Sequence, residues 1–479
     1  MTSISPPSTS SGSQPSITAG NEEKEDLERR LSTVDVVSVN ELVGSLPDPE
    51  LKLPRRRSLV IIILGSTLFQ FSFFVIISSA SAYTEHLGGT ATFSGLTIGI
   101  PTVLSGIALI FVAKYDGGGY SRPFNIAYAS MLVGNVLYAL AYRAHWLYLI
   151  LIGRMVVGIG FTSFMFIKKY CSDPDIVGIR RRTTLASWIV LSQGFGFSAG
   201  PFLGGLLYKV GFSNEIFNGY TSPGWIMAII WAIFWAASVL LFEDVPRTPS
   251  ETASPPTEKI QDNKGTPQSS VTPSPISWDR GARGLTMRQW AVVFFMCYYS
   301  MTCFFILSAW EANIPVFSGI ALGYSPYGAG NFIALGGITT FPLLLLNVWY
   351  ARRIQDRVTL AVGTSLGLGG ILILLAILCA DKVSFGPFYV AWFLVALGFN
   401  LASTCTMSLL SKQLPDSWNK DVSMAIQYSN YLGRVTGAIM GGAGVSMGMK
   451  NYAATQIAVV GLGGVMQMLL WKDLKAKKG

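Results

Sequence analysis

Charged side chains are scarce in this sequence. Asp, Glu, Lys and Arg together make up 13% of its 479 residues, whereas hydrophobic residues make up 51%. In soluble globular proteins about a quarter of the residues are charged, because water must solvate the surface. The mean hydropathy of +0.46 points the same way. The composition therefore excludes a soluble enzyme or binding domain of this length and indicates a surface that faces lipid.

Histidine and cysteine are also few, with two and five copies. His86 and His145 stand in no metal-ligand spacing, and the cysteines form no CxxC pair. We expect neither a metal site nor a cofactor. The sequence shows no Ser-His-Asp set and no phosphate-binding loop, so we do not expect an enzyme. The net charge of +9 is not gathered in a separate basic domain, which argues against nucleic-acid binding.

Long apolar runs take up most of the chain. Twelve of them approach the roughly 20 residues that a helix needs to cross a bilayer. The fold class is therefore all-α, a polytopic membrane protein with twelve transmembrane helices. The expected spans are 58–82, 93–113, 124–142, 146–167, 184–208, 223–242, 289–312, 326–350, 358–380, 387–411, 421–446 and 452–471.

A fourteen-residue pattern occurs twice, 237 positions apart, once in span five and once in span eleven. Glycines four residues apart line one face of a helix and let a neighbouring backbone come close. The offset aligns the first six spans with the last six, and internal repeats of this kind are typical of carriers. The motif residues are Gly196, Gly200, Pro201, Gly204 and Gly205 in the first copy, and Gly433, Gly437, Gly441 and Gly442 in the second.

The segments outside the spans differ in composition from the rest. Residues 1–54 are rich in Ser, Pro and acidic residues, lack a signal peptide, and are predicted to be a disordered cytosolic tail. Residues 55–242 form the first six-helix half and 287–472 the second. Residues 243–286 between them resemble the tail, and we interpret them as a cytosolic linker, either a tether or a site of phosphorylation or partner docking. Residues 473–479 are a basic cytosolic tail.

Lys and Arg are distributed unevenly about the spans. Of 35 such residues, Arg143, Lys209, Lys382 and Lys450 fall on one side and two lie within spans, which leaves 29 on the side of the termini. The positive-inside rule therefore places both termini in the cytosol. The protein is expected in the plasma membrane or in a vacuole or lysosome, with basic clusters touching anionic lipid.

Three motifs give the chain a resemblance to the major facilitator superfamily, over roughly residues 55–472. Arg154-x-x-x-Gly158-x-Gly160 in span four resembles the embedded-arginine motif of that superfamily, and the first glycine pattern resembles the motif of its drug:proton antiporters. The resemblance implies alternating access by a monomer, with the glycine faces of spans five and eleven packed against spans eight and two. The loops after spans two and eight are similar to its gating loops, through Asp116, Arg122, Arg352, Arg353, Asp356 and Arg357.

A finer resemblance is to the vacuolar and lysosomal branch of this superfamily. It is carried by Gly219-Tyr220-Thr221-Ser222-Pro223-Gly224-Trp225, by Ser411-Lys412 and by Tyr431-Leu432-Gly433-Arg434. That branch includes the lysosomal carrier linked to neuronal ceroid lipofuscinosis and the vacuolar phosphate carriers with an SPX domain. The N-terminal tail here shows no SPX domain.

Three ionisable residues stand out within the spans. Arg154 and Arg434 lie inside apolar runs, and Glu311 falls near the outer end of span seven, four residues before Pro315. A charge in the membrane costs several kcal/mol unless it faces a cavity or a partner, which makes each a functional candidate. The alternatives are that the arginines only bond backbone carbonyls and that Glu311 is a loop acid. The candidate substrate-binding or coupling residues are Arg154, Glu311, Arg434, Gln70, Asn331 and Asn400, while Gln193 and Asn430 occupy matching repeat positions.

Two embedded cations against one acid predict a positive cavity that favours an anion. The many aromatic residues suit an amphipathic metabolite equally well. We therefore expect a secondary transporter that moves a small organic molecule, anionic or amphipathic, out of the cytosol by alternating access, as an efflux antiporter if Glu311 carries protons. The alternatives are exchange or downhill flow, a vacuolar or lysosomal phosphate or chloride carrier or channel, and a non-transporting receptor or scaffold. The sequence leaves the substrate, direction, coupling ion and membrane open.

Overall fold

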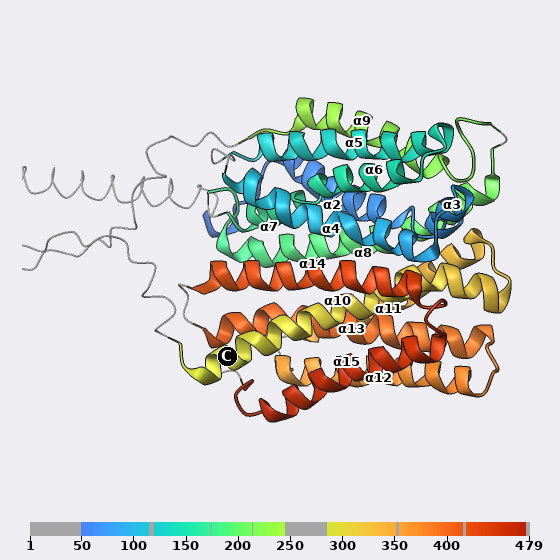
Figure 1. Cartoon of the computed structure of the whole chain (residues 1–479). Helices are drawn as coiled ribbons and strands as arrows, with labels where there is room; N and C mark the ends of the chain where they lie inside the picture. Colours follow the sequence, from blue (N-terminus) through green and yellow to red (C-terminus); the bar gives the residue numbers. More distant parts are fainter. Residues whose placement is uncertain are drawn as a thin grey trace, which may run out of the picture.

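The computed structural model describes residues 49–114, 119–173, 175–212, 214–244, 285–350, 354–414 and 418–475. Most of the predicted tail and linker, and the loop residues Asp116, Arg352 and Arg353, lie outside this range. Regular structure in the described part is helical (Figure 1). The elements are η1 (Pro49–Leu51), α2 (Arg56–Phe74), α3 (Ala80–His86), α4 (Ala91–Lys114), α5 (Ser121–Ala144), α6 (Leu147–Gly160), α7 (Ser163–Ser172), α8 (Ile179–Val210), α9 (Ser222–Leu241), α10 (Met287–Leu322), α11 (Pro326–Tyr350), α12 (Asp356–Cys379), α13 (Phe385–Gln413), α14 (Asn419–Ala443) and α15 (Met449–Leu469).

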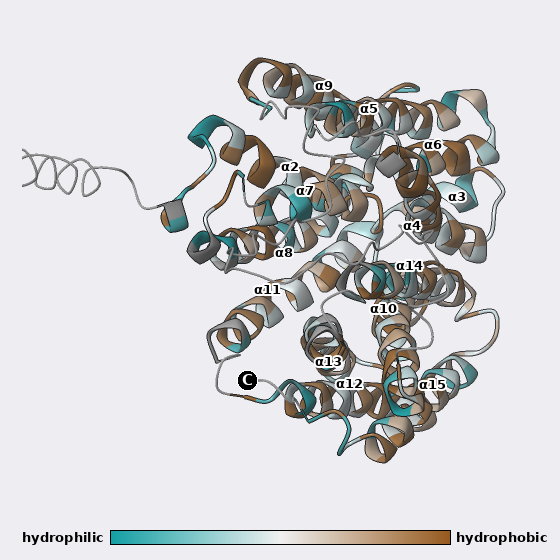
Figure 2. Ribbon diagram, turned by 90° about the vertical axis from the view of Figure 1, so that its left-hand side faces the viewer, coloured by the Kyte–Doolittle hydropathy of each residue, from teal (hydrophilic) through white to brown (hydrophobic). Residues whose placement is uncertain are grey.

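The helices form two bundles that correspond to the two predicted halves. In Figure 1 the first half (blue to green) lies above the second (yellow to red), and their helices run nearly side by side. The halves meet chiefly along two helix pairs, α4 with α14 and α8 with α11. Many large hydrophobic side chains are exposed, for example Leu240 and Leu469, as a lipid-facing surface requires, and Figure 2 shows hydrophobic residues along the outer helices, viewed down their axes. The all-α membrane fold predicted from the sequence is confirmed.

Within the described residues, eleven spans are long and apolar enough to cross a membrane. Of the twelve predicted spans, the one that falls short is span eleven, which is α14. After a polar first turn it carries Gln427 and Asn430 before the glycine motif and Arg434 within it. Its polarity is the first sign that α14 faces water or ligand rather than lipid.

Two predicted spans are broken helices. Span one consists of α2 and α3, separated by Val75–Ser79, and span four of α6 and α7, separated at Phe161 and Thr162. At both breaks the backbone N–H groups donate to carbonyls three residues back, for example from Ile77 to Phe74 and from Phe161 to Gly158. This tighter 3₁₀ winding interrupts the α-helix without exposing polar backbone to lipid.

Span seven is longer than predicted. Its helix α10 runs from Met287 to Leu322 and continues through Pro315, so the predicted end at 312 was wrong. A proline inside a helix removes one hydrogen bond but is tolerated in membrane helices whose neighbours compensate. Glu311 therefore lies within a helix rather than in a loop.

The glycine motif brings helices together, but not with the predicted partners alone. A Cβ at Gly200 would come within 2.6 Å of the Phe74 Cβ in α2, and one at Gly437 within 2.8 Å of the Phe305 Cα in α10. These contacts are with spans one and seven of the same half. Only the second glycine of each final pair crosses between halves, with Gly205 meeting Pro326 and Tyr327 in α11 and Gly442 meeting Ala91 in α4.

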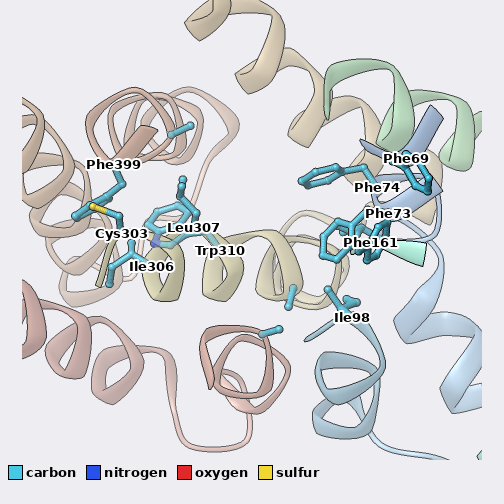
Figure 3. Packing of buried hydrophobic residues seen from close by; sticks show 14 of the residues in the cluster. Phe69, Phe73, Phe74, Ile98, Phe161, Cys303, Ile306, Leu307, Trp310 and Phe399 are labelled. Atoms are coloured by element: carbon cyan, nitrogen blue, oxygen red, sulfur yellow. The ribbon is translucent and has the colours of Figure 1, made fainter. Parts of the chain in front are cut away.

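Aromatic side chains fill the interior of each half. Figure 3 shows Phe69, Phe73, Phe74 and Phe161 clustered in the first half, where the Phe73 and Phe161 ring centroids are 5.5 Å apart. A second cluster surrounds Trp310 in the other half, with Cys303, Ile306, Leu307 and Phe399. The buried cysteines are thus packing residues, as expected from their spacing.

Candidate substrate cavity

A cavity lies between the two halves, near the middle of the helices. It consists of two pockets of about 180 and 280 Å³, whose linings share Gln70, Gln193, Phe304 and Arg434. The first pocket is further lined by Phe73, Thr102, Phe161, Phe164, Lys168, Gln427, Asn430 and Tyr431; the polar or charged lining of the second includes Glu311, Thr340, Asn400, Ser403 and Thr404.

The cavity is closed at the end of the bundle that lies away from the termini. There the two halves meet backbone to backbone, where Gly442 adjoins Ala91 and Gly330 adjoins the Pro201 carbonyl. Nearer the termini the same helix pairs are held apart by side chains, with Tyr428 against Gly106 and Phe341 against Gly194. The backbones of the two halves thus come closer at the closed end than at the end where α2 begins and α9 ends (Figure 1). We call the latter end the terminal face and the opposite end the far face.

Arg434 and Glu311 form an ion pair in the wall of the cavity. Arg434 Nη1 lies 3.3 Å from Glu311 Oε2, and Glu311 is buried whereas Arg434 retains 17% of its side-chain exposure. The guanidinium carbon also lies 5.0, 5.6 and 5.4 Å from the ring centroids of Phe73, Phe74 and Phe304. Aromatic faces stabilise a cation without neutralising it. Two of the predicted residues, 123 positions apart, are thus brought together, and Glu311 is not a loop acid.

Lys168 supplies a second cation, which the sequence analysis missed. The predicted span ended at residue 167, but α7 continues to Ser172 and places Lys168 in the cavity lining. The adjacent Lys169 points elsewhere, over the rings of Tyr120 and Phe166 at 5.7 and 5.8 Å. The spacing of Phe161, Phe164 and Lys168 places all three on one helix face, and this spacing could have identified Lys168 from the sequence.

Arg154, the other predicted cavity cation, does not line either pocket. It is 1% exposed, and its Nε donates a hydrogen bond to the Thr97 carbonyl at 3.2 Å. Among the described residues, its two terminal nitrogens have no hydrogen-bond partner. The two arginines expected in one cavity are therefore not both in its lining in this conformation, where Lys168 is the second cation.

The predicted amide residues divide in the same way. Gln70 and Asn400 line the cavity, as do the repeat-related Gln193 and Asn430. Asn430 bonds to Ser300, and Asn400 Nδ2 donates to the Ala396 carbonyl at 2.7 Å. Asn331 is absent from the lining, and its Oδ1 has no partner among the described groups. It is the one amide of the predicted set that the structure does not place at the cavity.

The described residues of the predicted gating loops make local contacts. Asp356 accepts a hydrogen bond from Ser408 in α13 at 2.7 Å, and Arg357 donates to the Trp471 carbonyl at 3.1 Å. Arg122 is exposed at the start of α5. A carboxylate not predicted from the motif, Asp244, accepts from the backbone N–H groups of Tyr120 and Ser121. These contacts tie helix ends together at the terminal face, and gating itself stays a prediction.

Residues 62–438 match the family model of the Major Facilitator Superfamily. The chain belongs to the major facilitator superfamily. It is 32% identical over 435 residues to an uncharacterized MFS-type transporter of Schizosaccharomyces pombe, covering 89% of this chain and 83% of that one. It is 30% identical over 197 residues to an SPX domain-containing membrane protein of Arabidopsis thaliana, covering 40% of this chain and 27% of that protein. This second relative supports the resemblance to the SPX-type branch.

Solved structures confirm the major facilitator fold. The structure of a D-xylose–proton symporter superimposes with a TM-score of 0.65, at 14% sequence identity, over 88% of this chain and 98% of that one. At this identity the likeness shows the fold alone. The protein is therefore a multi-pass membrane protein of a transporter family, and its substrate must be inferred from the residues of its own cavity.

Proposed function

We propose that this major facilitator protein carries a small organic anion across a membrane by alternating access. The observation that carries the proposal is the charge of the cavity. Lys168 from the first half and Arg434 from the second line it, while Glu311 is the one acid among the described lining residues. Since Glu311 already pairs with Arg434, an excess of positive charge faces the empty space.

The rest of the lining suits the organic part of such a substrate. Amide groups of Gln70, Gln193 and Asn430 supply donors and acceptors, and the rings of Phe161 and Phe304 supply flat apolar surface. A cavity with convergent cations and aromatic walls binds an anionic head group together with an apolar body. Inorganic phosphate or chloride would use the cations but leave the aromatic walls unpartnered.

Glu311 is the proposed coupling residue. An anion that binds Arg434 competes with the Glu311 carboxylate and leaves it without its cation in a buried place, which favours uptake of a proton. Anion and proton then move together, toward the less acidic side. This differs from the efflux antiport that the glycine motif suggests, and flux under imposed pH gradients distinguishes the two.

Counterflow and current measurements on proteoliposomes test the proposal. The probes are inorganic phosphate, chloride, a monocarboxylate, a dicarboxylate and a sugar phosphate, each added to the purified protein on a solid-supported membrane. We expect saturable transport of at least one organic anion, seen as counterflow and, where the anion and its protons carry net charge, as current. If none of the organic anions moves while the protein is folded, the proposal is wrong. If chloride alone moves, the protein is an inorganic anion pathway.

Matched variants connect the flux to the cavity. Arg434→Lys keeps the charge but loses the planar fork that binds an anionic group in two places, and Lys168→Gln removes a charge. Each is expected to lower transport by about tenfold or more, the equivalent of one charge-assisted hydrogen bond. Lys169→Gln is the control, because Lys169 is adjacent to Lys168 in the sequence but its side chain points away from the cavity. Equal loss in all three variants would contradict a role for the cavity cations.

A further inference from the structure

Arg154 has hydrogen-bonding capacity that the described structure does not use. Its Nε is satisfied by Thr97, yet both terminal nitrogens are buried without a partner. No described carboxylate pairs with it. The Tyr138 hydroxyl, on the helix packed against α6, is likewise buried without a partner. An arginine held in this way inside a membrane protein carries a high free-energy penalty unless the free donors are used in another state.

A single ring lies between Arg154 and the cavity. Phe73 lines the cavity, and its ring centroid lies 5.0 Å from the Arg434 guanidinium carbon and 5.7 Å from that of Arg154. Figure 3 shows the Phe73 ring beside that of Phe161. Arg154 stands in α6, in the half of span four that starts at the far face. It is therefore placed on the closed side of the cavity, behind Phe73.

The backbone next to Phe73 has the form of a hinge. Phe73 is the last residue but one of α2, and the break at Val75–Ser79 follows directly. The hydroxyls of Ser78 and Ser79 in this break are buried and have no hydrogen-bond partner. A helix end beside such a break can shift with few hydrogen bonds lost, whereas a residue in mid-helix cannot.

We propose that Arg154 is a second anion site of the transport path, closed off in this conformation by Phe73. When the far face opens and Phe73 withdraws, the two free N–H pairs of Arg154 and the Tyr138 hydroxyl bind the anionic group that Arg434 and Lys168 hold when the terminal face is open. The inference rests on the proposed anionic substrate. In this proposal one anion binds first at Arg434 and then at Arg154 as the transport cycle proceeds.

Cysteine labelling tests access to this site without any flux. Two reporters lie on α4 in a background whose five cysteines are replaced: Thr102→Cys, which lines the cavity, and Thr97→Cys, whose carbonyl binds Arg154. The probes are the anionic sulfonatoethyl and the cationic trimethylammonium methanethiosulfonates. Thr102→Cys should react with both reagents and Thr97→Cys slowly. Adding Phe73→Ala should raise the rate at Thr97→Cys with the anionic reagent by about tenfold, and Phe73→Leu should raise it less.

The charge preference decides whether Arg154 is the cause. In the Phe73→Ala background, Arg154→Gln should abolish the faster reaction of the anionic reagent at Thr97→Cys and leave Thr102→Cys unchanged. The inference is overturned if Phe73→Ala does not change the Thr97→Cys rate relative to Thr102→Cys, or if the anionic preference survives Arg154→Gln. Should a variant not fold, the wild-type background labelled with and without substrate gives the same comparison of the two reporters.

Two sources of the anionic group are separated by protection. If chloride, exchanged for gluconate, slows labelling of Thr97→Cys in the Phe73→Ala background, an inorganic anion occupies the site. If only the transported organic anion does so, the site belongs to the substrate path. Protection by neither overturns the inference. Normal anion transport with no effect on labelling would overturn the Arg154 site but not the proposed function. Anion-selective labelling without anion transport would support the site but overturn the proposed function.

Discussion

At the scale of single residues, the ion pair of Glu311 and Arg434 must stabilise a buried carboxylate and yet leave Arg434 able to bind an anion. A buried carboxylate is stable as an anion only beside its cation, and removing the partner of a buried charge is strongly unfavourable. Arg434 is better placed to lose its partner, because it keeps some exposure to the cavity and lies over three rings. The ion pair is therefore expected to break by movement of Arg434 toward the cavity, while Glu311 stays buried.

Glu311→Gln is expected to separate coupling from transport. Glutamine preserves the shape but cannot take up or release a proton, so accumulation against a gradient under a pH difference should be lost. Exchange of labelled for unlabelled substrate needs no net proton movement and should survive. The measurement is uptake into proteoliposomes with and without a pH step, compared with counterflow in the same preparation.

The control for this prediction is Glu85→Gln, which changes an exposed acid in α3 whose carboxylate accepts a hydrogen bond from Ser81 at 3.2 Å. It should leave both modes intact. If Glu311→Gln still concentrates substrate under a pH difference, the carrier is coupled elsewhere or is not coupled to protons.

The sequence indicated which residues are unusual but not where they meet. Charges within apolar runs are rare and costly, so Arg154, Glu311 and Arg434 could be singled out from the sequence. Whether a given arginine lines the cavity depends on helix rotation and on the conformation, which separates Arg434 from Arg154 by one ring. Lys168 was missed because hydropathy does not locate the end of a helix that continues past the apolar run.

Close packing at the scale of helices depends on the glycine faces of α8 and α14. Gly437→Leu must displace the backbone at Phe305, since a Cβ at Gly437 would already lie 2.8 Å from the Phe305 Cα. Overpacking of this kind costs about 1–3 kcal/mol or more. We expect a lower thermal unfolding midpoint and loss of transport, with membrane insertion retained, and the same for Gly200→Leu at Phe74.

Gly461→Leu in α15 provides the control, because a Cβ there meets no atom within 4 Å. It should insert, unfold and transport like the wild type. Wild-type transport and stability in Gly437→Leu would show that close approach is unnecessary in α14.

The same helices show what a pattern can predict. Glycines at every fourth position required a close neighbour, and one is present. The pattern did not say which neighbour, and the glycines of the four-residue spacing face α2 and α10 instead of α11 and α4. The breaks in spans one and four were not foreseen either, because the residues at 75–79 and 161–162 are as apolar or small as their surroundings and hydropathy runs evenly through them.

At the scale of the whole molecule, the internal repeat was enough to predict two six-helix halves, since each half must bury its own interior. It could not predict which face is open, because a duplicated carrier has both conformations in one sequence. The structure resolves this by contact type: backbone meets backbone at the far face, whereas Tyr428 and Phe341 side chains meet glycines toward the terminal face. The open cavity and the excess of Lys and Arg therefore share one side.

This asymmetry makes a prediction about access from the two sides of a membrane. In proteoliposomes sorted by protease cleavage of an N-terminal tag, Thr102→Cys in the cavity should react with an impermeant reagent only from the side of the tag. Lys450→Cys, at an exposed position in the first turn of α15, should react only from the opposite side. The reason is that the far face is sealed where Gly442 adjoins Ala91, so a reagent on that side meets the loop but not the cavity. In cells, the positive-inside rule predicts that the tag side is cytosolic. Labelling of both positions from the side opposite the tag would show that the termini and the open cavity lie on opposite sides of the membrane, which would contradict this prediction.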